Sequence, residues 1–362
     1  MMMEKREKIS SFDALRVYSC FVVMAYHAFL VVPGYSGLSI FFVMSGFLCT
    51  YNHFGEGETS KLDLRGSLRF SLDKIKKLYP LHLVMLIYPL ATQLYGLVNG
   101  LLPAWRFITK LAANVLLIHA WIPVNEYYFS FNVPTWYLSV MMFLYFMLPF
   151  VLRCMEKYRS RRTALLAAVA IFLVQGVSAD LLEQAYVVLL PESLQTGLFY
   201  QWLDQVCPLY RLGDFAIGCN VAYFFIHRGE RDISRPRATL LELAAILFIA
   251  LSQISYDLRP RNITCVFIPS SAFIVYVFAL DRGYISGFLK NKLVKHLSAL
   301  SSDIYLIHYP VIMVSSFIST SLPLAAGAQK AFFLCFAFGG TYVLALLWRA
   351  ARKKHRKAAL KG

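Results

Sequence analysis

The sequence predicts an all-α integral membrane protein, a polytopic bundle of about ten transmembrane helices plus one re-entrant or interfacial segment. Of the 362 residues, 58% are hydrophobic and only 15% are charged, and the mean hydropathy is +0.56. A soluble domain holds about a quarter charged residues, so this much apolar surface needs a bilayer to cover it. The apolar residues fall in runs of about 20, the length that crosses the hydrocarbon, and clusters of Lys and Arg separate the runs.

Ten apolar runs are long enough to be candidate spans. They begin near Asp13, Ser36, Pro80, Pro134, Thr163, Pro208, Ala238, Ile263, Leu297 and Ala331. The first run is too long for a secretory signal peptide and lacks a small-residue cleavage site. We therefore expect it to be the first membrane span.

The charges of the loops predict the orientation, because cytoplasmic loops carry an excess of Lys and Arg. A cytoplasmic N-terminus places these basic segments inside: residues 55–79, 153–162, 227–237, 281–295 and 349–361. The stretch 179–205 has no Lys or Arg and falls outside. Both termini are therefore predicted to be cytoplasmic. Arg259 and Arg261 are exceptions, since the scheme leaves them outside.

An eleventh apolar stretch, residues 111–122, is shorter and is interrupted by Asn114 and His119. If it crossed the membrane, the basic cluster 153–162 would lie outside, against the charge rule. We therefore predict a re-entrant or interfacial segment on the outer side.

The domain organisation is expected to be simple, with a cytoplasmic segment at residues 1–12, one membrane domain at 13–350 and a basic cytoplasmic tail at 351–362. The net charge of +16 lies in loops between apolar runs, which favours contact with anionic lipid over nucleic acid. The seven cysteines form no C-x-x-C pair and no ligand spacing with His, so we predict no metal and no permanently bound cofactor. The sequence leaves the oligomeric state open.

The first predicted span carries Arg16 and His27, eleven positions apart. That spacing is about three helical turns, roughly 16 Å, so both side chains project from nearly one face. Ionisable groups within a membrane usually face a cavity. An imidazole can act as a general base, and a guanidinium can bind phosphate. The alternative is a His satisfied by a neighbouring helix and an Arg that anchors the helix end.

The beginning of the chain resembles a known family. Asp13-x-x-Arg16 is followed after ten residues by His27, then by a Gly-rich turn and Phe41-Phe42-Val43-Met44-Ser45-Gly46-Phe47-Leu48. This pattern is similar to the start of the acyltransferase 3 family. Its members are membrane acyltransferases that O-acylate bacterial surface and secreted polysaccharides and some small molecules.

Later segments resemble the same family in order and spacing. They are Lys74-x-x-Lys77-x-x-Pro80, Pro134-Thr135-Trp136-Tyr137-Leu138-Ser139, Arg211-Leu212-Gly213-Asp214 and Tyr305-Leu306-Ile307-His308-Tyr309-Pro310. Two departures stand out. Lys replaces the usual Arg before the proline, and Met141 and Met142 stand where many relatives carry acidic residues.

The resemblance implies acyl-CoA, most often acetyl-CoA, as co-substrate and a carbohydrate or glycolipid hydroxyl as acceptor, in a bacterial plasma membrane. His27 becomes the expected general base. Expected donor or acceptor contacts are Asp13, Arg16, Ser45, Gly46, Phe47, Lys74, Lys77, Trp136, Arg211, Tyr305 and His308. Some relatives carry an added esterase domain, whereas this chain ends after the basic tail, so a stand-alone membrane domain is expected.

His308, Trp136 and the overall function each have more than one interpretation at this stage. His308 orients His27 or contacts the acceptor, or it is a packed residue bonded to a carbonyl. Trp136 belongs to the interfacial aromatic belt, the slightly favoured interpretation, or stacks on a sugar. The whole protein is alternatively a transporter or flippase of glycans or lipids, although residues 34–46 have no counterpart in the second half, as a repeated transporter fold would show.

Overall fold

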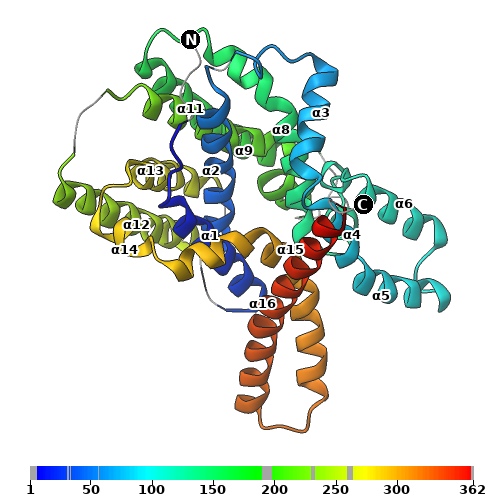
Figure 1. The fold of residues 1–362 in the computed structure, drawn as a ribbon. Helices are drawn as coiled ribbons and strands as arrows, with labels where there is room; N and C mark the ends of the chain where they lie inside the picture. Colours follow the sequence, from blue (N-terminus) through cyan, green and yellow to red (C-terminus); the bar gives the residue numbers. More distant parts are fainter. Residues whose placement is uncertain are drawn as a thin grey trace.

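The computed structural model describes residues 6–30, 32, 34–55, 57–189, 198–229, 233–258 and 264–359, so Arg259 and Arg261 lie outside the described residues. Over these ranges the chain is helical without a strand, which confirms the predicted all-α class (Figure 1). The longer helices are α1 (Phe12–His27), α2 (Gly34–His53), α3 (Leu64–Ile75), α5 (Ile87–Val98), α6 (Ala104–Val115), α8 (Trp136–Met155), α9 (Arg161–Leu189), α11 (Pro208–Ile226), α12 (Arg235–Leu258), α13 (Phe267–Leu280), α15 (Lys292–Ser321) and α16 (Ala326–Ala359). Shorter helices are α4 (Tyr79–Met85), α7 (Asn125–Tyr128), α10 (Leu198–Gln201) and α14 (Tyr284–Leu289), with single turns η1 (His119–Trp121), η2 (Val133–Thr135), η4 (Trp202–Val206) and η5 (Thr264–Val266).

Seven helical stretches of the described chain are long and apolar enough to cross a membrane. They are Gly34–His53, Tyr79–Val98, Val133–Met155, Arg161–Leu181, Arg235–Leu258, Lys292–Ser321 and Ala326–Lys354. The other three predicted spans correspond to α1, α11 and α13, which are shorter or more polar. A membrane protein is therefore established, whereas ten crossings and two cytoplasmic termini stay predictions.

Burial divides the helices into a central and a peripheral set. In α2 and α15, 67% and 61% of the membrane-crossing stretch is buried inside the protein. In α9 and α16 the value is only 17%, and the α15–α16 hairpin projects from the bundle (Figure 1). The peripheral helices thus present apolar side chains to lipid, while the central helices can enclose polar ones.

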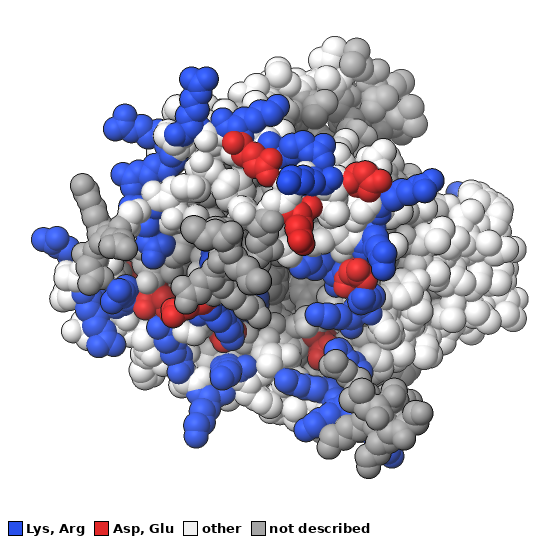
Figure 2. All heavy atoms as spheres, turned by 45° about the horizontal axis from the view of Figure 1, so that its top comes forward, with Lys and Arg blue, Asp and Glu red and all other residues white. Residues whose placement is uncertain are grey.

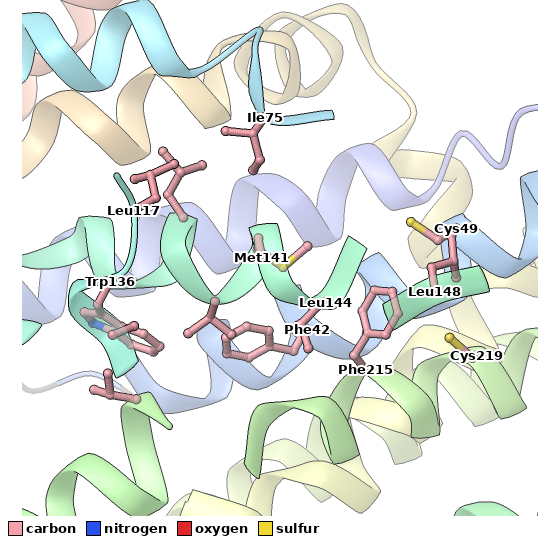
Figure 3. Close-up of a cluster of buried hydrophobic side chains, with 14 of the residues drawn as sticks. Phe42, Cys49, Ile75, Leu117, Trp136, Met141, Leu144, Leu148, Phe215 and Cys219 are labelled. Carbon is pink, nitrogen blue, oxygen red and sulfur yellow. The ribbon is translucent and has the colours of Figure 1, made fainter. Parts of the chain in front are cut away.

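The central contact joins α2 to α11 through two glycines. A Cβ on Gly46 would lie 2.0 Å from the carbonyl oxygen of Phe215, and one on Gly218 would lie 2.0 Å from that of Val43. Only glycine permits this backbone approach, a common device between membrane helices. Beside it, Phe42, Leu144 and Phe215 pack between α2, α8 and α11 (Figure 3).

The predicted outer segment at residues 111–122 corresponds to the end of α6 and to η1. α6 has only 12 residues, about 18 Å of helix, too short to cross. With α5 it forms a hairpin at the side of the bundle (Figure 1). The basic side chains of α6, Arg106 and Lys110, form ion pairs with Glu126 of α7. These ion pairs attach α6 to α7.

Basic side chains gather on one face of the molecule. Figure 2 shows the face that lies at the top of Figure 1, where Lys and Arg outnumber Asp and Glu. The distribution fits the predicted cytoplasmic side, because positive residues mark that side of a membrane protein.

Candidate active site

A cavity of about 1110 Å³, here named the histidine chamber, contains His27 at the end of α1. Its polar lining comes from Gln201, Asp204, Gln205, Gln253 and Asp257. Its aromatic lining comes from Tyr26, Tyr35, Trp136, Tyr256, Tyr305 and Tyr309. Amides, carboxylates and aromatic faces around one space can bind a hydroxylated ligand and orient it.

His27 and His308 face each other from α1 and α15. Nε2 of His308 lies 3.1 Å from Nδ1 of His27, and Nδ1 of His308 lies 3.3 Å from the carbonyl oxygen of Ile304. A carbonyl only accepts, so Nδ1 of His308 carries the hydrogen and its Nε2 is an acceptor. His27 must then donate from Nδ1, which leaves its Nε2 as a lone pair in a residue that lines the chamber. That is the form a general base needs.

His308 therefore combines two of the alternatives left open by the sequence. It is bonded to a backbone carbonyl, and it also contacts His27. The side chain of His308 is buried, whereas His27 is half-buried. The geometry supports the predicted role of His308 in orienting the other ring.

A proline two residues later explains how this part of α15 is fixed. Pro310 has no N–H, so the carbonyl of Leu306 loses its helical partner. The side-chain amide of Asn132 donates to that carbonyl at 2.9 Å. The hydroxyl of Tyr305 also donates to the carbonyl oxygen of Pro134 at 3.3 Å. These two bonds join α15 to the turn that precedes Trp136.

Trp136 starts α8 and is only 6% exposed. It lines the histidine chamber and packs near Phe42 and Tyr137. Its burial contradicts the interfacial-belt interpretation, because a belt residue faces lipid headgroups. The proline and the 3₁₀ turn at Val133–Thr135 direct the indole inward instead.

Arg211 is buried and fully engaged in protein contacts. Its guanidinium binds the carboxylate of Asp214 at 2.7 Å, the carbonyl oxygens of Asp204 and Gln205, and the hydroxyl of Thr264. The structure thus places Arg211 behind the turn Trp202–Val206, whose Asp204 and Gln205 line the chamber. Its geometry supports a positioning role, and a direct substrate contact stays a prediction.

A second cavity of about 170 Å³, here named the lysine chamber, lies beside Lys74. Apart from Lys74, Ser301 and Ser302, its lining is mainly apolar and aromatic, including Phe41, Tyr137 and Tyr145. Nζ of Lys74 lies 3.2 Å from Nε2 of His53. Lys77 is exposed and is not part of this lining.

Three aromatic rings, those of Phe41, Tyr137 and Tyr305 and here named the aromatic septum, lie where the two chambers meet. Tyr305 lines both chambers. Its ring centroid lies 5.3 Å from that of Tyr137 and 5.9 Å from that of Phe41. Ser45 is a hydrogen-bonding partner of the Tyr137 side chain. Ser45 therefore adjoins the septum.

The remaining predicted residues lie in helix contacts. Asp13 accepts from Ser298 at 2.8 Å and pairs with Lys8, so it joins the start of α1 to α15. Arg16 lies 3.8 Å from Asp13 and is partly exposed. Phe47 is buried against Phe12. Like Gly46, it packs between helices and lines neither chamber.

Sequence reasoning missed much of the chamber lining. Tyr35, Gln201, Gln253, Tyr256 and Asp257 come from three different helices and do not form a short motif. The available signal was the polar and aromatic character of segments predicted to face outward. Among the described residues, no group of three or more His, Cys, Asp or Glu side chains is placed to hold a metal.

Comparison with known proteins defines the class. A family profile described as an acyltransferase domain matches residues 9–350. The chain is also 24% identical over 321 residues to the acyltransferase MdmB of Streptomyces mycarofaciens, which covers 83% of this chain and 76% of the relative. No solved structure matches. Together with the apolar helices, these matches define a membrane acyltransferase.

More particularly, the chain belongs to the acyltransferase 3 family. The family predicted from the motifs is thereby confirmed. The roles of the individual site residues stay predictions that the geometry now makes specific.

Proposed function

We propose that this protein is an O-acyltransferase that moves an acyl group, most simply acetyl, from acyl-CoA to a hydroxyl of a cell-surface or lipid-linked carbohydrate. One observation carries the proposal. His27 keeps an acceptor nitrogen in a wide polar chamber, while His308 holds its other nitrogen at 3.1 Å. A second, narrow chamber with a lysine lies behind the aromatic septum.

The donor enters from the lysine chamber. Acyl-CoA is cytoplasmic and polyanionic, and Lys74 provides positive charge at this site. Arg16, Lys76 and Lys77 add to the same predicted cytoplasmic mouth. The pantetheine arm is thin and largely uncharged, so it suits a narrow space with few charged groups. Tyr305 is the residue past which the thioester reaches His27.

The acceptor enters the histidine chamber from the opposite, extracytoplasmic side. Carboxylates and amides can bind sugar hydroxyls, and the tyrosines and Trp136 offer flat faces to sugar rings. The size of about 1110 Å³ suits a ligand larger than water or a simple alcohol. The proposal includes a bacterial plasma membrane as the location, with donor and acceptor on different sides.

The chemical step follows from the tautomers. Nε2 of His27 removes the proton from the acceptor hydroxyl as its oxygen attacks the thioester carbonyl. The carbon–oxygen bond forms, the carbon–sulfur bond breaks, and the proton passes from His27 to the leaving CoA thiolate. His308 accepts from Nδ1 of His27, so it stabilises the imidazolium during the step. The net products are an ester and CoA.

The test is CoA release by the purified protein with acetyl-CoA and membranes that contain the natural acceptor. Wild-type protein should release CoA and form base-labile acetyl esters, while His27→Ala should do neither at a measurable rate. His296→Ala is the matched control, because His296 is an exposed histidine bonded to Tyr342. A wild-type protein that neither binds nor consumes acetyl-CoA would instead favour a transporter or flippase.

A further inference from the structure

A third cavity, here named the annex, lies next to the histidine chamber and has a volume of about 370 Å³. The two cavities share four wall residues, Phe129, Val133, Tyr309 and Met313. The ring of Tyr309 lies edge-on to His27, with 5.5 Å between centroids. The annex therefore begins one aromatic ring away from the proposed base.

The annex contains a charged pair in which the lysine is buried and the glutamate is exposed. The side chain of Lys110 on α6 is only 8% exposed, and its ammonium lies 3.0 Å from the carboxylate of Glu126. Arg106 approaches the same carboxylate at 3.6 Å. The hydrogen bond from Lys110 lowers the pKa of Glu126, so this carboxylate is ionised at neutral pH. An ammonium has three donors, and Glu126 needs only one of them.

The rest of the lining is polar on one side and aromatic on the other. Gln93 and Asn125 contribute amides, and Thr92 and Ser130 contribute hydroxyls. Phe129 and Tyr309 supply rings at the shared wall. Mixed donors and acceptors with flat faces match a neutral polyhydroxylated ring. The hydroxyls of Thr92 and Ser130 already donate to the carbonyl oxygens of Pro89 and Tyr127, so the amides and the remaining donors of the Lys110 ammonium are the groups that such a ring would engage.

We propose that the annex is a second acceptor subsite, which binds the sugar unit adjacent to the one acylated in the histidine chamber. The proposal rests on the proposed function. It makes the acceptor a glycoside of at least two units rather than a free monosaccharide. Lys110, Glu126 and Gln93 then determine acceptor specificity without taking part in the chemical step.

A simpler role for the charged pair is to join α6 to α7. That role predicts a loss of stability when the pair is removed, with the same effect on every acceptor. The subsite predicts a loss confined to acceptors that extend into the annex. The two roles therefore differ in KM for long and short acceptors.

The experiment fills the annex with Gln93→Trp and removes its ammonium with Lys110→Met. Leu94→Trp is the matched control, because Leu94 is the next residue on α5, is 42% exposed and does not line the annex. Labelled acetyl-CoA is the donor, and membranes from the source organism with the gene deleted supply the natural acceptor. Acetyl-CoA-dependent thermal stabilisation reports the fold and the donor site.

Both annex variants should retain donor stabilisation and lose tenfold or more of the label transferred, while Leu94→Trp resembles wild type. The methyl glycoside of the sugar found acetylated in the wild-type product should then be acetylated equally, within twofold, by wild type and Gln93→Trp. Unchanged transfer by both annex variants, or an equal loss with the methyl glycoside, would overturn the subsite. Absence of donor binding and transfer in the wild type would instead contradict the proposed acyltransferase reaction itself.

Discussion

The histidine chamber and the lysine chamber meet at Tyr305 but differ in size and chemistry. The first has about 1110 Å³ and a lining rich in amides, carboxylates and tyrosines. The second has about 170 Å³ and a mainly apolar lining with one lysine. The difference indicates two unlike ligands, a bulky hydroxylated one and a thin one with a distant anionic group. One uniform passage for a single transported molecule would not need such contrast.

The largest effect is expected in the histidine chamber. His27→Ala should lower the rate of acetyl transfer by roughly 10²- to 10⁴-fold, the usual contribution of a general base. Acetyl-CoA binding should change little, because the donor's charged end lies in the other chamber. Single-turnover transfer and a separate binding titration measure the two quantities. Equal transfer rates in variant and wild type would remove His27 from the chemistry.

A smaller effect is expected in the lysine chamber. Lys74→Ala should raise the KM for acetyl-CoA roughly tenfold, because a hydrogen bond to a charged group contributes about 1.5–3 kcal/mol. Both lysines are exposed, but only Lys74 lines the chamber, so Lys77→Ala should raise this KM far less. Initial-rate kinetics at saturating acceptor separate the two. If Lys74→Ala changed only the KM for the acceptor, the lysine chamber would not be the donor site.

A third effect is expected at Tyr305, where the ratio of CoA release to acyl transfer should change several-fold. Tyr305→Ala removes a ring that lines both chambers, so water should reach the thioester more easily. We expect CoA release without acceptor to rise and transfer to acceptor to fall. Tyr305→Phe keeps the ring and serves as control, losing only the bond to Pro134. If Tyr305→Ala released CoA and transferred the acyl group in the wild-type ratio, the septum would not separate the ligands.

The smallest effect on turnover is expected at the hydrogen bond between Asn132 and Leu306, the residue that follows Tyr305. Asn132→Ala leaves the carbonyl of Leu306 without its side-chain partner, and an unsatisfied buried group costs about 1–3 kcal/mol. The thermal midpoint should fall by several degrees. Asn99→Ala is the control, since the amide of Asn99 bonds a carbonyl at an exposed position. Equal thermal midpoints in the two variants would mean that the bond from Asn132 to Leu306 does not stabilise this part of α15.

The sequence predicted the helices better than the spaces between them. Hydrophobic runs marked the start of every stretch that is long and apolar enough to cross, because lipid exposure demands apolar side chains on nearly all faces. No such run marked α3 or α6. The contact between His27 and His308 was one of two open alternatives, since spacing along a single helix says nothing about the facing helix. The tautomers depended on the carbonyl of Ile304, which carries no sequence signal.

Other features required the three-dimensional arrangement. Asn132 lies 174 residues from its partner Leu306, and neither residue is unusual in sequence. Trp136 was expected slightly more as a belt residue, because hydropathy cannot distinguish an inward indole from an outward one. Gly46 was expected to bind a ligand, but its missing side chain permits contact with Phe215 instead. Short motifs thus selected positions, whereas the contacts of those positions came from the three-dimensional arrangement.

The two bonds from α15 to the turn before Trp136 have a thermodynamic consequence. Tyr305 and Leu306 are held to Pro134 and Asn132, so a shift of the septum also shifts the wall that receives the acceptor. Binding of one substrate then changes the affinity for the other, and linkage requires the factor to be the same in both directions. Donor and acceptor are therefore expected to bind cooperatively, although the proposal assigns each its own side of the protein.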